Sequence, residues 1–146
     1  MNVWGNDGGK TAFALMPSVK FPKNSGGLGN SAVEGGLIVP LAVSLPMDWS
    51  MGVMTEFDFN RNEQKDYYTD FSNTITLGHQ IIGNLNGYVE FFSSFNEEED
   101  STWVGTTDLG LTYALSEDIQ LDGGVNIGVT RSAEDFNPFL GFSIRY

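Results

Sequence analysis

Apolar and polar residues alternate along most of this chain, and this pattern constrains its fold more than any other feature. From residue 120 to residue 130, the apolar residues Leu121, Val125 and Ile127 stand at odd positions, whereas the polar residues Asp122 and Asn126 stand at even positions. We call the odd and even positions of a segment its two parities. Successive side chains of a β-strand point to opposite faces, so the segment predicts a strand between an apolar and a polar environment. Seven further segments alternate in the same way: 10–21, 34–45, 49–60, 67–81, 86–95, 102–114 and 140–146. We therefore predict an all-β protein of about eight strands, without helices.

The connections between these segments are alternately long and short. The long ones are 22–32, 61–66, 96–101 and 131–138, and the short ones are 46–48, 82–84 and 116–118. In an antiparallel meander, alternate connections fall at the same end, so all the long loops would share one end. This layout is typical of an up-and-down transmembrane β-barrel of the outer membrane. We interpret residues 1–146 as a single barrel domain, or as the C-terminal part of a longer barrel.

Alternation alone fits two kinds of barrel. A lipocalin-like barrel is apolar inside, around a ligand, whereas a membrane barrel is apolar outside, against lipid. The polar parity here is rich in Gly, Ser, Thr, Asn and carboxylates, which favours lipid contact for the other face. The chain also ends on an aromatic residue in an alternating segment, which is typical of strands that the barrel assembly machinery recognises. Aromatic residues near strand ends are predicted to lie at the two membrane interfaces: Trp49, Tyr67, Trp103, Tyr113 and Tyr146.

Charge and composition exclude several functions. Seven basic and 19 acidic residues give a formal net charge of −12, so a nucleic-acid partner is not expected. The absence of cysteine removes disulfides, thiolate metal sites and cysteine nucleophiles. His79 is the one histidine and is predicted to face the membrane interface, without the serine partner that a hydrolase needs. We expect neither an enzyme nor a cofactor.

Ten charged residues of the polar parity are predicted to face the interior. In an open lumen their carboxylates would favour cations, whereas in a filled barrel Lys and Arg would pair with them. A run of four acidic residues in a long connection is a weaker candidate for binding a divalent cation, and it also fits a solvated loop tip. The interior set is Lys10, Lys20, Glu34, Glu56, Asp58, Asp70, Glu90, Asp108, Asp122 and Arg145, and the acidic run is Glu97, Glu98, Glu99 and Asp100.

Six stretches of the chain carry a family resemblance: 2–9, 34–42, 88–92, 108–114, 126–130 and 137–141. In this order they resemble the outer-membrane, transporter-like family "putative MetA-pathway of phenol degradation". The resemblance implies a bacterial outer-membrane barrel that transports small solutes, with aromatic ones expected from the family name. Members are usually longer, so this chain resembles their C-terminal portion. The implied partners are outer-membrane lipid and lipopolysaccharide, the barrel assembly machinery, which reads the C-terminal strand, and further copies in a homo-oligomer.

Three functions from different classes fit these observations. The first is a channel or transporter component. The second is a non-conducting barrel that serves as an anchor, surface-binding protein or assembly unit, because an eight-stranded barrel has room only for its own side chains. The third is a soluble lipocalin-like binder, which the polar inner face disfavours.

Overall fold

The computed structural model describes residues 1–5, 9–22, 32–62, 64–97 and 101–145. Within these ranges the chain forms strands and turns, and no helix long and apolar enough to cross a membrane occurs in them. The strands are β1 (Asn2–Trp4), β2 (Thr11–Ala14), β3 (Met16–Lys20), β4 (Glu34–Ser44), β5 (Trp49–Arg61), β6 (Tyr67–Ile82), β7 (Leu85–Asn96), β8 (Val104–Ala114), β9 (Ile119–Gly128) and β10 (Phe136–Ile144). The predicted all-β class is confirmed.

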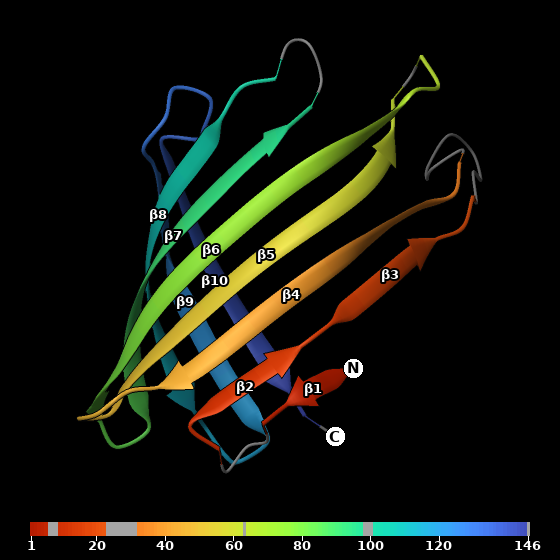
Figure 1. The fold of residues 1–146 in the computed structure, drawn as a ribbon. Coiled ribbons are helices and arrows are strands. Elements are labelled where there is room, and N and C mark those ends of the chain that lie inside the picture. Colours follow the sequence, from red (N-terminus) through yellow and green to blue (C-terminus); the bar gives the residue numbers. More distant parts are fainter. Residues whose placement is uncertain (6–8, 23–31, 63, 98–100, 146) are drawn as a thin grey trace.

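All the strands belong to one antiparallel sheet whose order is β1-β2-β4-β5-β6-β7-β8-β9-β10, with β3 also paired to β4. From β4 onwards each strand pairs with its neighbour in sequence, which is the predicted up-and-down arrangement. The sheet twists and curls, so that β9 and β10 lie behind β4 and β5, and the two chain ends lie near each other (Figure 1). Within the described residues the sheet stays open, with edges at β1–β3 and β10.

The described residues form ten strands, whereas the alternation predicts about eight. The first reason for the difference is a break in the predicted strand 10–21. That segment forms β2 and β3, which pair with β4 in one continuous register, as Phe13 opposite Leu41 and Met16 opposite Ile38. The break follows Ala14, which the register places opposite Pro40, and Pro40 lacks the N–H that a β-ladder requires. The N–H of Leu15, at the break, donates to the Met1 carbonyl on the other side (2.9 Å).

The second reason for the higher count is β1, a three-residue strand that pairs irregularly with β2 and has no alternation long enough to predict it. The last strand also differs from the prediction. It begins at Phe136 and includes Pro138, so the long connection predicted for 131–138 ends earlier. Proline is tolerated in β10 because this is an edge strand.

The single curled layer buries very little of the apolar surface. Among the described residues the only buried apolar side chain is Ala32, 6% exposed, and the only buried polar one is Asp108, 8% exposed. Large apolar side chains in the middle of the sheet remain about half exposed, such as Ile75 at 45% and Leu109 at 47%. A hydrophobic core on one face, which a water-soluble sheet needs, is therefore lacking in this part of the chain.

Candidate functional site: the sheltered polar face

The strand register sorts the side chains into an outer apolar face and an inner polar face. Leu77, Val89 and Leu109 lie side by side on β6, β7 and β8 and are 37%, 38% and 47% exposed. One residue along each strand, Glu90 and Asp108 lie side by side on the opposite face, where Asp108 is 8% exposed. The curl of the sheet therefore shelters the polar face and exposes the apolar one.

A row of polar side chains crosses the middle of this inner face. The register places Thr76 opposite Glu90, Glu90 opposite Asp108, and Asp108 opposite Asn126. The Thr76 hydroxyl donates a hydrogen bond to Glu90 Oε2. Asn137 of β10 continues the row beyond Asn126. We call Thr76, Glu90, Asp108 and Asn126 the middle row.

A second acidic group lies near the long-loop end of the same face. Asp58 is opposite Asp70, and the Asn60 side-chain amide donates to Asp70 Oδ2 (2.7 Å). Lys20 lies opposite Glu34 at the end of β3. Glu56 lies two residues before Asp58 on β5, so its side chain points to the same inner face, nearer to the middle of the strand. The backbone N–H of Arg61 donates to Glu34 Oε1 (3.3 Å).

Two more of the predicted interior residues lie at the short-turn end. Asp122 is opposite Gly141, where its carboxylate fills the space that a side chain at position 141 would need. Lys10 precedes β2, and its carbonyl accepts from the N–H of Ser44 (2.7 Å). The structure thus spreads the predicted interior charges along the whole inner face.

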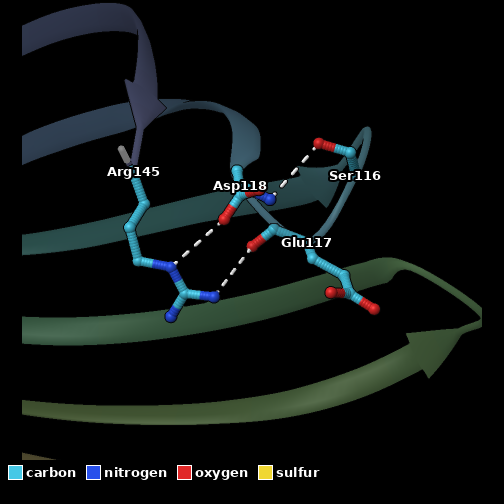
Figure 2. Close-up of polar contacts among 4 residues, drawn as sticks. All are labelled: Ser116, Glu117, Asp118 and Arg145. Atoms are coloured by element: carbon cyan, nitrogen blue, oxygen red, sulfur yellow. Dashed lines mark hydrogen bonds and ion pairs between the residues drawn. The ribbon is translucent and has the colours of Figure 1, made fainter.

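Arg145 lies at the short-turn rim of the sheet, beside the turn between β8 and β9 (Figure 2). Its Nε lies 3.3 Å from Asp118 Oδ1, and its Nη2 donates to the Glu117 carbonyl (3.3 Å). The N–H of Asp118 donates in turn to Ser116 Oγ (3.3 Å). The Arg145 side chain is 69% exposed, and its ion pair is the only one that forms among the described residues. Arg145 therefore binds the turn between β8 and β9. Its guanidinium group forms its ion pair there and not with a carboxylate of the inner face.

Aromatic rings on the inner face were not among the predicted site residues. The phenol of Tyr88 lies directly over Gly110, its neighbour on β8, and the Phe139 ring lies against Gly124 on β9. A side chain at either glycine would overlap its neighbours. The signal for this packing is a glycine opposite an aromatic residue of the same parity, but recognising it requires the strand register.

The inner face is hollowed at both ends. A cavity of about 800 Å³ at the long-loop end is lined by polar and aromatic residues that include Tyr68 and Asn96. A second cavity, of about 420 Å³, lies toward the short turns and is lined by Ser50, Thr76, Tyr88, Thr112 and neighbouring residues. The middle row borders this second cavity through Thr76. We call it the lower cavity.

The predicted interface aromatics lie at both ends of the outer face. Trp49 and Tyr113 are at the short-turn ends of β5 and β8, 41% and 46% exposed. Tyr67 and Trp103 are at the long-loop end, 58% and 53% exposed. Tyr146 lies outside the described residues. The rings of Trp49 and His79 are 4.6 Å apart, and His79 also borders the lower cavity.

Comparison with known protein families supports one assignment. Residues 1–146 match the family model described as "Putative MetA-pathway of phenol degradation". The chain belongs to this family. This match confirms the family resemblance found in the sequence. In this member of the family, the described residues form an all-β, antiparallel sheet. No curated protein and no solved structure matches the chain.

The inner face of this family member carries polar and aromatic side chains side by side. It presents carboxylates, hydroxyls and amides, together with the rings of Tyr88 and Phe139. No group of three Asp, Glu, His or Cys side chains arranged to hold a metal ion occurs among the described residues. The acidic run is only partly described, because Glu97 lies within the described ranges whereas Glu98, Glu99 and Asp100 lie outside them.

Proposed function

We propose that this protein is a channel-like β-barrel of the bacterial outer membrane that admits small solutes, aromatic ones included. The observation that carries the proposal is the inverted distribution of polarity. Apolar side chains in the middle of the sheet are exposed on the outer face, whereas a carboxylate is the most sheltered polar residue of the inner face. Lipid is the solvent that makes an exposed apolar face favourable.

Two further features support this environment and this cargo. The exposed Trp and Tyr side chains at both ends of the outer face fit the two membrane interfaces, where aromatic residues are enriched. The lower cavity, at about 420 Å³, is within the usual size range of small-ligand pockets. The family name supports an aromatic solute such as phenol. We expect no enzymatic activity, since the ring of the one histidine, His79, packs against Trp49.

The open edges require a partner in lipid. Each unpaired backbone group in hydrocarbon costs several kcal/mol, so β10 must pair either with the β1–β3 edge of its own chain or with a second copy. The proposed partners are accordingly membrane lipid and lipopolysaccharide, the assembly machinery acting on β10, and another copy where the chain does not close on itself.

The proposal is tested with protein refolded in detergent and reconstituted in lipid. We expect discrete conductance steps in a planar bilayer and phenol uptake into liposomes above the rate of empty vesicles. The Thr112→Trp variant narrows the lower cavity and should reduce both. Leu111→Trp adds the same ring on the outer face of the same strand and should change neither. A chain that folds as a monomer in plain buffer would contradict the membrane assignment.

A non-conducting barrel is the second candidate, and the rings of the inner face favour it. Tyr88 and Phe139 fill the space over Gly110 and Gly124, as in small barrels whose interior holds only side chains. Folded protein that inserts in lipid without conductance or uptake would support this anchor or assembly role. The same experiment thus separates the two candidates.

A further inference from the structure

The glycines of the inner face are of two kinds. At Gly110, for example, a neighbouring side chain, the Tyr88 phenol, fills the space that a Cβ would need. Gly52, in the interior of β5, differs, because a Cβ added there comes no nearer to another atom than 3.9 Å, at Thr76. Glycine weakens a strand, and inside one it often marks a place where a ligand approaches the backbone. The space above Gly52 is therefore open to a ligand.

This open space belongs to the lower cavity, whose floor consists of small residues. Gly52 lies opposite Ala42. Ser50 lies opposite Gly78, and all four residues line the cavity. A floor without large side chains lets a ligand come close to the sheet across neighbouring strands. A planar ring uses such a surface best, because all its atoms can touch the floor at once.

The Tyr88 ring stands beside this floor, and Gly110 determines its position. Tyr88 lies between Gly78 on β6 and Gly110 on β8. Its phenol leans over Gly110, and no Tyr88 atom lies within 4 Å of the position that a Cβ would take at Gly78. The ring therefore forms a wall of the cavity and leaves the floor uncovered. Aromatic rings attract one another in offset or edge-to-face arrangements, so this wall suits a ring-shaped ligand.

The charged groups around the cavity are carboxylates. Asp48 lines it, and Glu90 accepts the hydrogen bond of Thr76 at its border. Asp122 lies opposite Thr112, another lining residue. No lysine or arginine is among the described residues that line the cavity. Burying an organic anion here without a cationic partner is unfavourable, whereas the hydroxyl groups can bond an uncharged polar substituent.

We propose that the lower cavity binds an uncharged, planar ring with a polar substituent. Gly52 and Gly78 form the floor, Tyr88 forms the wall, and Gly110 keeps the cavity open by giving the Tyr88 ring its place. The site rests on the proposed function, because it lies on the face that the membrane assignment places inside the barrel. It narrows the solute class to uncharged rings, and binding to it does not depend on conduction.

The test is isothermal calorimetry on the full chain refolded in detergent, with protein-free micelles as the blank. The probes are phenol, cyclohexanol, which is not planar, benzoate, which is an anion, and benzylammonium, which is a cation. We expect one saturable site for phenol and binding about tenfold weaker or more for the other three, the discrimination that one pocket contact provides. Equal binding of phenol and cyclohexanol would overturn the planar site, and equal or tighter binding of either ion would overturn the uncharged class.

A variant of the floor locates the site. Gly52→Val fills the open space and should weaken phenol binding by about tenfold or more. Val53→Phe is the matched control, because it adds bulk at the next residue of the same strand, on the outer face, and should leave binding unchanged. Unchanged binding in Gly52→Val, or an equal loss in Val53→Phe, would contradict the proposal.

A paired variant tests the role of Gly110 and guards against poor folding. Gly110→Ala takes the place of the Tyr88 ring, which must then turn toward Gly78 and cover the floor. This variant should lose phenol binding, and adding Tyr88→Ser should restore part of it, because the displaced ring is then gone. A loss that the second substitution does not reverse would contradict the role of Gly110.

The site and the proposed channel can fail separately. Phenol uptake into liposomes without this pattern of binding would overturn the site and leave the channel function intact. The expected binding pattern without uptake or conductance would support the site and favour the non-conducting barrel.

Discussion

The two faces of the same strands make opposite demands on their residues. On β6, Ile75 is 45% exposed on the outer face, and its sequence neighbour Thr74 lies on the inner face between Met54 and Phe92. The outer face tolerates large apolar side chains side by side without any layer above them. The inner face alternates carboxylates, glycines and rings that interlock. The surroundings of a residue in this protein therefore depend on the face to which its side chain points, more than on its neighbours in the sequence.

An arginine on each face gives the largest expected contrast. Ile75→Arg places a charge against lipid and should lower the free energy of unfolding by about 2–4 kcal/mol. Thr74→Arg places the same charge on the inner face, where the next inner-face residues beyond its neighbours Met54 and Phe92 are Glu56 and Glu90, and should cost less. Urea unfolding of both variants in lipid vesicles measures the difference. Equal losses would show that the outer face does not contact lipid.

The packing of aromatic rings against glycines on the inner face can be tested by adding a side chain at a glycine. Gly110→Val forces a side chain into the Tyr88 ring and should destabilise the fold by about 1–3 kcal/mol. Gly52→Ala is the control, because an added Cβ there comes no nearer to another atom than 3.9 Å, at Thr76. Unfolding in urea compares the two variants. A similar loss at both positions would mean that the Tyr88 contact is not the cause.

Ring contacts on the outer face should contribute less. The rings of Phe71 and Phe95 are 5.3 Å apart in an edge-on arrangement, and such a pair contributes roughly 0.5–1.5 kcal/mol. Phe95→Ala should lose this amount relative to Phe91→Ala. Phe91 lies on the same strand and face, and it makes no contact with another aromatic ring within the described residues. A Phe91→Ala variant that loses as much stability would assign the effect to lipid contact alone.

The smallest effect is expected at the rim, which belongs to neither face. Asp118→Asn removes the ion pair between Asp118 and Arg145. The side chains of both residues are more than half exposed. Exposed pairs contribute about 0–1 kcal/mol, so the free energy of unfolding should change by less than 1 kcal/mol, and less still in high salt. Unfolding at two salt concentrations checks this. A larger, salt-independent loss would indicate that the turn anchors the sheet.

The long strands were predictable because alternation is a local property. Residues 49–60 alternate without interruption, and β5 spans Trp49–Arg61. The break between β2 and β3 was not predictable, because Pro40 acts from the neighbouring strand and only the register brings it opposite the break. For the same reason β1 escaped prediction, since its three residues gain order from pairing with β2.

Part of the candidate site was likewise readable in the sequence. Parity alone assigned Glu90 and Asp108 to the polar face, because side-chain direction repeats every second residue. It could not show that the two residues are register partners or that Thr76 donates to Glu90. Arg145 has the inner parity as well, yet it turns to Asp118 at the rim, because the last residues of a strand are free to bond with a nearby turn.

The sequence by itself determined the all-β class, the two-sided polarity and the family, because each of these is carried by residue order along one strand or one stretch. Only the tertiary structure decided which residues meet across strands: the ring of Tyr88 over Gly110, the facing carboxylates and the open edges. The physical reason is that register is a relation between strands, set by every turn and bulge together, and no single segment contains it.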